Sequence, residues 1–429
     1  MKIRIGIFGG VANNMYVVAK TLAKYGFDIT FIRDITDWYP FSQPVWEDIP
    51  FTISYNEISK TNIFTAQYWR NVEERLNWQT PAWLVTPRIK VINPILMKIL
   101  RLFESDPIEK EIMREFLKND ILLVCGIVGE ILASKTGLPY FIWPHGADIR
   151  IASGIHKFNG GFIDYPVFLI LRRKLGRAFE KAYLVLSHDP AGIAGYLGDA
   201  SPFLNRIRYD FLPIPHKERE RLPRKERIKR LKHLMISVLQ IGDVNEKVFD
   251  GDYLICFVPS RIDFYWKGHD ILFRAISRKD FPIYLIFAGW GNDYLKALEF
   301  VKESKVERKV RFLDFALSKP LLYQMFDSVD IVIDQFRFGT YGTSAVEAFA
   351  GGAPVMMYIN NEYFARRGWE APQVLNVSSE DEIVQCLEDI LNNKIDLEEV
   401  SKRTKQWFQR RHSEEVFINL FSKILETLR

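Results

Sequence analysis

One segment, residues 339–355, constrains the fold of this chain more than any other. It reads Gly-Thr-Tyr-Gly-Thr-Ser-Ala-Val-Glu-Ala-Phe-Ala-Gly-Gly-Ala-Pro-Val, and an apolar stretch at 331–333 precedes it. The pattern predicts a strand, a glycine loop, a short helix that begins near Thr343 or Ser344 and ends at 351–352, and a second strand at 354–358. Such a helix points unbonded N–H groups at the sheet edge where open α/β proteins bind ligands, which favours an anionic ligand. Glu347 has a second interpretation, because Ser344-Ala-Val-Glu347 also fits a helix capping box.

Two more strand–loop–helix units carry suitable residues at the same place. The apolar stretch 254–258 is followed by Arg261, Lys267 and a helical pattern at 270–276. A guanidinium and an ammonium at a strand's carboxyl end can neutralise a diphosphate without a metal, although each alone also fits a solvated surface charge. The stretch 284–288 runs into Gly289-Trp-Gly291. Three such loops together predict a phosphate-binding edge on a parallel sheet.

The C-terminal half resembles the retaining nucleotide-sugar glycosyltransferases of family 4 (glycosyl transferases group 1), which have the two-domain GT-B fold. The resemblance follows the family's order of motifs: Ser260-Arg261, Lys267-Gly-His-Asp270, Phe287-Ala-Gly-Trp-Gly291, Val310-Arg-Phe-Leu313, Asp330-Ile-Val-Ile-Asp334, and Tyr341-Gly342 with Glu347-Ala-Phe-Ala-Gly-Gly-Ala-Pro-Val355. It implies an α/β protein with two Rossmann-like domains whose parallel sheets face each other across a cleft.

The N-terminal half resembles the family more loosely. A strand at 2–9 leads into Gly9-Gly10-Val-Ala-Asn13-Asn14, a glycine and asparagine turn, and then a helix to about residue 25. After a strand at 120–124, residues 139–148 resemble the family's His-Gly-x-Asp element through His145 and Asp148. The resemblance covers most of the chain, whereas residues 35–115 and 213–250 carry no motif.

The resemblance also implies a role for each motif residue. Glu347 would hold the donor ribose, and the backbone from Phe315 to 317 would face the base. His145 and Asp148 are the expected catalytic residues beside the reacting carbon, although a histidine before a glycine at a strand end is as often structural. The departing phosphate would help to take the acceptor proton, so we expect no protein nucleophile. We expect no cofactor, and no metal, because two cations already face the diphosphate and no convincing carboxylate pair does. The expected donor-binding set is Gly10, Asn13, Arg261, Lys267, Gly289, Phe315, Gly342, Thr343, Ser344 and Glu347.

The chain departs from the family at one position. The family's glutamate pair would place its first member eight residues before Glu347, where this sequence has Gly339. In relatives that glutamate contacts the donor sugar. Its loss is compatible with nucleotide binding, but it leaves open which sugar is bound and how the sugar is held. Asp334 or Gln335, at the end of the preceding strand, is a candidate replacement.

Length and composition agree with two domains. The chain has 429 residues, of which 48% are hydrophobic, enough for two cores of ordinary size. We expect an N-terminal acceptor-binding domain at 1–212 and a basic interdomain linker at 213–250. A nucleotide-sugar-binding domain at 251–397 and a C-terminal helix at 398–429 that crosses back to the first domain complete the expected organisation.

Charge and cysteine content bear on partners and location. With 58 basic and 53 acidic residues the net charge is only +5, which argues against a nucleic-acid binder. Cys125, Cys256 and Cys386 show no metal-ligand spacing, and the first two lie in apolar strands as buried thiols do. Because no apolar run approaches about 18 residues and the start resembles no signal peptide, we expect a cytoplasmic protein.

Two segments raise the question of membrane contact. Nine Lys or Arg residues lie between Lys217 and Lys232, which fits either a solvated helix between domains or a surface that touches anionic lipid. The stretch 165–174 runs from apolar residues into three cations, which supports the second interpretation. Peripheral contact with the inner face of a membrane therefore stays open.

The expected function is that of a retaining glycosyltransferase that transfers a sugar from a nucleoside-diphosphate sugar to a glycan or lipid-linked acceptor, in cell-envelope or polysaccharide synthesis. Gly339 keeps a non-catalytic GT-B nucleotide-binding subunit as an alternative, and another GT-B enzyme such as a sugar-nucleotide epimerase would share the fold. Asp250-Gly-Asp252 matches the metal motif of the other large glycosyltransferase fold, but a turn that enters a strand explains it better.

Overall fold

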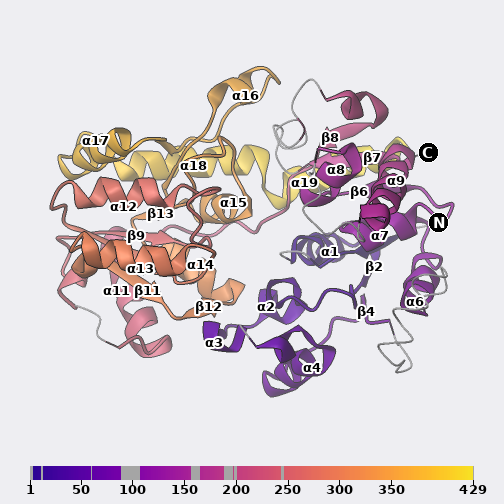
Figure 1. Cartoon of the computed structure of the whole chain (residues 1–429), viewed down its shortest axis with the longest axis horizontal. Helices are drawn as coiled ribbons and strands as arrows, with labels where there is room; N and C mark the ends of the chain where they lie inside the picture. Colours follow the sequence, from indigo (N-terminus) through magenta and orange to yellow (C-terminus); the bar gives the residue numbers. More distant parts are fainter. Residues whose placement is uncertain are drawn as a thin grey trace. The chain divides into compact units, whose positions relative to one another are not determined.

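The structure is a computed structural model that describes residues 3–10, 13–58, 60–87, 107–155, 165–187, 197, 201–242 and 246–428. The chain divides into two compact units, coloured by sequence in Figure 1. The first contains residues 1–47, 61–215 and 417–429, and the second contains residues 48–60 and 216–416. Val11 and Ala12 of the predicted glycine and asparagine turn lie outside the described residues.

The first unit is built on a seven-stranded parallel sheet with the order β4-β2-β1-β5-β6-β7-β8. The strands predicted at 2–9 and 120–124 are present as β1 and β5. The strands are β1 (Arg4–Phe8), β2 (Asp28–Ile32), β4 (Leu84–Val85), β5 (Ile121–Val124), β6 (Tyr140–Ile142), β7 (Leu184–Ser187) and β8 (Tyr209–Phe211). Its helices include α1 (Asn14–Lys24), α2 (Pro44–Asp48), α4 (Ala66–Arg75), α6 (Pro107–Phe116), α7 (Ile127–Ala133), α8 (Ala147–Ser153) and α9 (Tyr165–Lys181).

The second unit is built on a six-stranded parallel sheet with the order β11-β10-β9-β13-β14-β15. The strand predicted at 254–258 has the expected bounds, and the motif at 310–313 forms β11. The strands are β9 (Leu254–Val258), β10 (Ile283–Ala288), β11 (Val310–Leu313), β13 (Ile331–Ile333), β14 (Val355–Met357) and β15 (Leu375–Asn376). The helices are α11 (Arg224–His233), α12 (His269–Ser277), α13 (Tyr294–Glu303), α14 (Lys319–Ser328), α15 (Thr343–Ala350), α16 (Asn361–Ala365), α17 (Glu380–Leu391) and α18 (Leu397–Arg411).

Strand β9 shows why this sheet forms. All five of its residues are buried, as in a strand covered on both faces. Leu254, Cys256 and Val258 pack into a core with α12, α13 and α17. Ile255 and Phe257, on the opposite face, pack into a second core with α11, α14, α15 and α18. The sheet is therefore the middle layer of three, and its carboxyl edge carries the loops that bind ligands in such folds.

A short segment from the N-terminal half belongs to the second unit, which the sequence did not indicate. Strand β3 (Thr52–Ser54) pairs antiparallel with β12 (Phe315–Leu317), and α3 (Tyr55–Ile58) follows β3. The amide of Phe51 donates to the Ser318 hydroxyl at 2.8 Å, and the amide of Ser318 donates to the Phe51 carbonyl at 3.0 Å. Residues 48–60 therefore belong to the second unit, although the sequence analysis expected them in the N-terminal domain.

The boundary at 213–250 also differs from the expected linker. Residues 216–242 and 246–250 belong to the second unit, where Ile228 and Leu231 of α11 enter its core. Four of the nine basic residues, all of them arginines, bond to Asp327, Asp330 or backbone carbonyls of this unit. Arg224 and Arg227 contact the buried Asp330, Arg219 contacts Asp327, and Arg221 donates to two backbone carbonyls. The segment is thus a folded part of the second unit.

The C-terminal helix is interrupted. Helix α18 ends at Arg411 and α19 (Glu414–Glu426) begins after a break at 412–413. Helix α18 lies in the second unit, whereas residues 417–429 belong to the first. There Phe421 contacts Phe27 with ring centroids 6.0 Å apart, and the Tyr183 hydroxyl donates to the Thr427 carbonyl at 2.7 Å. No described helix is long and apolar enough to cross a membrane.

Candidate functional site

The strand order of the second sheet has a switch point between β9 and β13. From β9 the chain adds β10 and β11 on one side, and β13, β14 and β15 follow on the other. The loops after β9 and β13 therefore begin side by side at the carboxyl edge, where open α/β sheets bind ligands. The amide of Phe336 donates to the Lys267 carbonyl at 2.8 Å and ties the two loops together.

An ion pair crosses this switch point. The ammonium of Lys267 lies 2.7 Å from Oδ1 of Asp334, whose carboxylate is buried at the end of β13. Oδ2 of Asp334 has no hydrogen-bond partner within the described part of the chain. An ammonium has three donors, so the contact with Asp334 leaves two for another anion. Lys267 is thus positioned by a carboxylate and still able to bind a phosphate.

Arg261 lies in the same loop but is held less firmly. Its Nε donates to Oδ2 of Asp263 at 3.3 Å, and its side chain is about half exposed. Asp263 is buried and also accepts the amide of Trp266 at 2.8 Å. The predicted pair of cations is therefore present at one edge of the sheet, and each member has a carboxylate neighbour that the sequence did not assign to it.

His269 fixes the base of this loop. Its Nδ1 accepts the amide of Asp263 at 3.2 Å, and its Nε2 lies 3.3 Å from the Ser260 hydroxyl. Because Nδ1 accepts, the neutral ring carries its proton on Nε2. Burial, together with the charge of Lys267, lowers the pKa of His269 to about 4. The ring is therefore neutral near pH 7.

Helix α15 begins at the predicted place. Its N-cap is Gly342, in an extended conformation and without a side-chain cap, and Thr343 and Ser344 are its first two residues. The first amides of a helix have no acceptor within the helix. A Cβ built on Gly342 would meet no atom within 4 Å, so there is room at the helix start. The helix N-terminus predicted to bind a phosphate is present.

The capping-box interpretation of Glu347 is wrong. Gly342 is the N-cap, so Ser344 lies inside the helix and cannot cap it. The buried Glu347 carboxylate instead pairs through Oε1 with the ammonium of Lys319, the first residue of α14. Its Oε2 has no hydrogen-bond partner among the residues described. Sequence reasoning missed Lys319, although a lysine that directly precedes Pro320, a residue typical of a helix start, was a usable signal.

Gly339 stands where the family has its first glutamate, and the backbone conformation at this position favours glycine. Its φ is +70°, and a Cβ there would lie 3.0 Å from Asn360 Cβ and 3.2 Å from a ring carbon of Tyr358. Gln335 does not replace the glutamate, because all of its groups serve the loop. Its Nε2 donates to the carbonyls of 340 and 358, and its Oε1 accepts the amides of 337 and 338. Of the two candidate replacements, Asp334 alone keeps an unbonded oxygen.

Gly289 follows β10, which lies on the other side of β9 from β13. Phe315 follows β11, the next strand in the same direction. A Cβ on Gly289 would approach the Leu313 carbonyl to 2.1 Å, so glycine is required for close contact between β10 and the end of β11. Phe315 begins β12, whose backbone pairs with β3. One side of that backbone is therefore occupied, and contact of 315–317 with a base stays a prediction.

The first unit contains the remaining predicted residues, of which Gly10 and Asn13 follow β1 at the switch point between β1 and β5. Asn13 is the N-cap of α1 in a left-handed conformation, and its Nδ2 donates to the Gln43 carbonyl at 2.8 Å. Its buried Oδ1 has no hydrogen-bond partner in the described ranges. A Cβ on Gly10 would lie 3.1 Å from Ser42 Cβ, so the turn packs tightly on residues 42–43.

His145 and Asp148 follow β6 in the first unit. The buried Asp148 carboxylate accepts the amides of His145 at 2.9 Å, Gly146 at 3.0 Å and Ile149 at 2.7 Å. Nε2 of His145 lies 2.8 Å from the Cys125 thiol, and burial lowers the pKa of this histidine. Asp148 therefore shapes the turn that presents His145, and a catalytic role for His145 stays a prediction.

Other titratable groups surround this turn. Burial and the neighbouring Asp148 carboxylate raise the pKa of the Glu130 carboxyl well above its usual range. Burial likewise raises the pKa of the Cys125 thiol. Cys125, Cys256 and Cys386 are free and buried, as expected for the first two. Burial therefore disfavours the charged forms of both Glu130 and Cys125.

Asp250-Gly-Asp252 forms the predicted turn before β9. Gly251 has φ +105°, its carbonyl accepts a hydrogen bond from Arg224 at 2.9 Å, and the amide of Asp250 donates to the Lys247 carbonyl at 3.1 Å. Among the residues that the structure describes, no three His, Cys, Asp or Glu side chains are grouped to hold a metal ion. Metal independence stays a prediction.

A comparison with protein families finds a match that lies within the second unit. Residues 243–407 match the family described as glycosyl transferases group 1. No curated protein matches the sequence significantly. The matched residues include Arg261, Lys267 and Glu347.

Solved structures agree with the fold of the whole chain. HepE of Anabaena, in complex with UDP and glucose, has a TM-score of 0.63 at 12% identity over 99% of this chain and 100% of its own. Sucrose-phosphate synthase of Thermosynechococcus elongatus has a TM-score of 0.62 at 13% identity over 100% and 99%. The apo form of the lipopolysaccharide outer core galactosyltransferase WaaB has a TM-score of 0.52 at 13% identity over 100% of both chains. These similarities define the GT-B fold.

The chain has the GT-B fold. Its second unit contains the residues that match the group 1 glycosyl transferases.

Proposed function

We propose that this chain is a retaining glycosyltransferase of family 4 that transfers a sugar from a nucleoside-diphosphate sugar to a glycan or lipid-linked acceptor, in cell-envelope or polysaccharide synthesis. The observation that carries the proposal is the Lys267–Asp334 pair at the switch point of the second sheet, 2.7 Å across two loops. HepE, which shares the fold, is known in complexes with UDP and with UDP-glucose.

The donor site would lie between the first two loops and the start of α15. Lys267 and Arg261 would neutralise the diphosphate, and the amides at Gly342, Thr343 and Ser344 would bind its oxygens. Fixed charges and dipoles stabilise a leaving diphosphate most strongly where they need not reorganise. Two contacts hold these groups in place before a ligand binds. Lys267 is paired with Asp334, and Asp263 accepts the amide of Trp266 within its own loop.

Glu347 would bind the ribose hydroxyls through Oε2, the oxygen left by its pair with Lys319. Asp334 offers the only unbonded carboxylate oxygen among the residues proposed to replace the missing glutamate, so it would contact the donor sugar. In the first unit, His145 would face the reacting carbon and Asp148 would position it. The departing phosphate would take the acceptor proton, and no protein nucleophile takes part.

The test is a screen of UDP-, GDP- and ADP-sugars for thermal stabilisation, followed by mass spectrometry of reactions with candidate glycan acceptors in EDTA. We expect one nucleotide class to bind and its sugar to appear on an acceptor without added metal. Epimerised donor without transfer would favour an epimerase. Binding without turnover on any acceptor would favour the non-catalytic subunit. Activity lost in EDTA and restored by manganese would contradict the metal-free donor site.

A further inference from the structure

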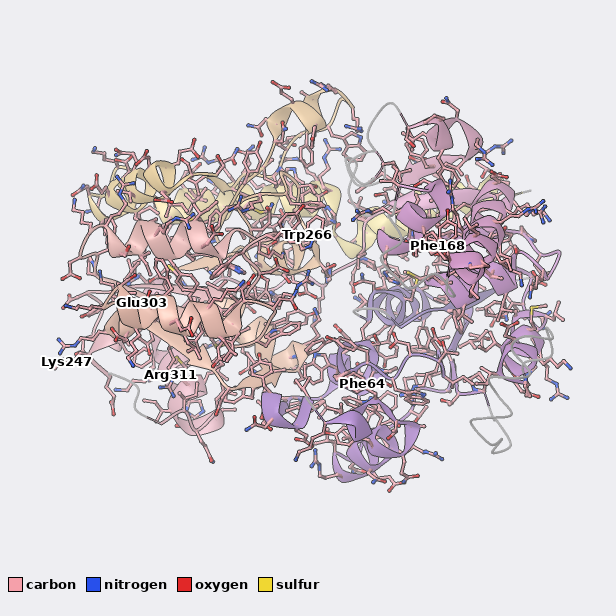
Figure 2. The ribbon with its side chains drawn as sticks, viewed as in Figure 1. Phe64, Phe168, Lys247, Trp266, Glu303 and Arg311 are labelled. Carbon is pink, nitrogen blue, oxygen red and sulfur yellow. The ribbon has the colours of Figure 1, made fainter. Side chains whose placement is uncertain are left out.

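Three aromatic side chains are exposed beside the candidate donor site. Tyr265 is 76% exposed, Trp266 39% and Phe338 38%. Tyr265 and Trp266 precede Lys267 in the loop after β9, and Phe338 lies in the loop after β13. Trp266 is labelled in Figure 2. Both loops therefore contribute rings to the edge that carries the Lys267–Asp334 pair.

The rings form one continuous surface, which we name the aromatic platform. The centroids of Tyr265 and Trp266 are 5.0 Å apart with nearly perpendicular planes, and those of Trp266 and Phe338 are 6.0 Å apart. The backbone beneath them is ordered by hydrogen bonds. The amide of Trp266 donates to Asp263 at 2.8 Å, and the amide of Phe338 donates to Gln335 at 2.6 Å. A surface on such bonded loops is formed before any ligand arrives.

Polar groups surround the platform. Arg337, next to Phe338, contacts the Asp270 carboxylate at 3.1 Å, and Lys267 follows Trp266 directly. Exposed aromatic residues with polar neighbours mark binding sites in soluble proteins. A pyranose is complementary to such a surface, because its C–H groups form an apolar face that can pack on an aromatic ring. Its hydroxyls lie around the rim, where they can bond to the polar neighbours.

We propose that the aromatic platform of Tyr265, Trp266 and Phe338 binds a sugar ring of the acceptor, with the C–H face of the pyranose on Trp266 and its hydroxyls near Arg337 and Asp270. The platform is contiguous with the candidate donor site through Lys267, so a ring bound there belongs to a saccharide that approaches the donor. The identification of this saccharide as the acceptor rests on the proposed function. Binding of the saccharide to the platform does not depend on sugar transfer.

The experiment measures binding of the labelled full-length protein to a printed array of bacterial and plant glycans, for the parent, Trp266→Ala and Tyr363→Ala. Tyr363 lies on α16 in the same unit and is exposed to a similar degree, so it is the matched control. Nucleoside diphosphate binding to each protein is measured separately by calorimetry. A third assay measures binding to vesicles of phosphatidylcholine and phosphatidylglycerol.

We expect the parent and Tyr363→Ala to bind a common set of glycans and Trp266→Ala to bind that set at least about tenfold more weakly. Nucleotide affinity of Trp266→Ala should stay within about twofold of the parent. A parent that binds no glycan, or an unchanged Trp266→Ala, overturns the platform. Loss of vesicle binding or of nucleotide binding in Trp266→Ala also overturns it, because the rings then serve a lipid surface or the donor base. A parent that binds glycans but no nucleotide contradicts the proposed function and leaves the platform intact.

Discussion

The ammonium of Lys319, at the start of α14, is paired with the carboxylate of Glu347 on α15. Glu347 is buried, and Lys319 is partly buried. The pair connects the helix that follows β12 with the helix whose N-terminus is the proposed phosphate site. One carboxylate oxygen of Glu347 holds Lys319, and the other, which has no partner among the described residues, is the oxygen proposed to bind the donor ribose.

Removal of Lys319 should destabilise the protein through this pair. We expect Lys319→Met to lower the free energy of unfolding by about 3–5 kcal/mol, since Glu347 would be left as an uncompensated buried charge. Glu347→Gln keeps an acceptor for Lys319 and should cost about 1–3 kcal/mol. Urea unfolding measures both. Lys279→Met, which removes an exposed pair with Glu388, is the control and should cost less than about 1 kcal/mol. Equal effects of Lys319→Met and Lys279→Met would show that the buried pair contributes nothing.

Restoring the family's first glutamate at Gly339 should fail. Its φ of +70° disfavours any side chain, and the nearest neighbours of a Cβ lie at 3.0 and 3.2 Å. We expect Gly339→Glu to lower stability by about 1–2 kcal/mol without raising sugar transfer. Gly342→Ala is the control, because its Cβ meets no atom within 4 Å and its φ is negative. A gain of activity in Gly339→Glu, with unchanged melting temperature, would contradict this account of the loop.

The sequence predicted much of this second unit because its strands are short, apolar runs with glycine loops. Strand β9 and helix α15 have nearly the expected bounds, and Arg261 and Lys267 lie at the expected edge. Both Rossmann-like sheets were expected from the resemblance, and the GT-B fold is confirmed.

Long-range pairing was the part that the sequence could not supply. Lys267 pairs with Asp334 across 67 positions, and Lys319 with Glu347 across 28, so no local pattern contains both partners. The capping-box interpretation of Glu347 failed for a related reason. The local motif was satisfied in sequence, but the helix began two residues earlier, at Thr343 after the Gly342 cap. The pairing of β3 with β12 joins segments more than 250 positions apart.

Stability should fall on mild acidification because of His269. Its folded-state pKa is about 4, below the usual value of 6.5, so the neutral form is favoured by folding. The contribution is fully present above pH 6.5 and is lost as the pH falls from 6.5 toward 4, by up to about 3 kcal/mol. Lys267, Asp334 and Asp263 are the charged groups that act on it. In urea unfolding between pH 7.5 and 5, His269→Gln should lose less stability than the parent. Parallel losses would show that His269 does not cause the dependence.

Helix α9 is the surface most suited to the peripheral membrane contact that the sequence left open. Val167 and Ile170 are among the most exposed apolar side chains of the first unit, and Arg172, Arg173 and Lys174 follow them. We expect the parent to sediment with vesicles that contain phosphatidylglycerol and Val167→Glu/Ile170→Glu to sediment with them less. Leu295→Glu, an exposed position on α13, should change nothing. If the double variant sediments as the parent does, α9 is not a lipid-binding surface.

The most direct test of the donor site is the affinity for a nucleoside diphosphate and for its nucleoside, measured by calorimetry after a panel of UDP, GDP and ADP has identified the best binder. The variants are Arg261→Ala and the double variant Lys267→Ala/Asp334→Asn, which avoids a buried unpaired carboxylate. Lys296→Ala, on an exposed pair with Asp293, is the control. We predict that both variants lose at least about tenfold in affinity for the diphosphate and keep their affinity for the nucleoside. Unchanged diphosphate affinity in both variants would contradict the donor site at the switch point between β9 and β13.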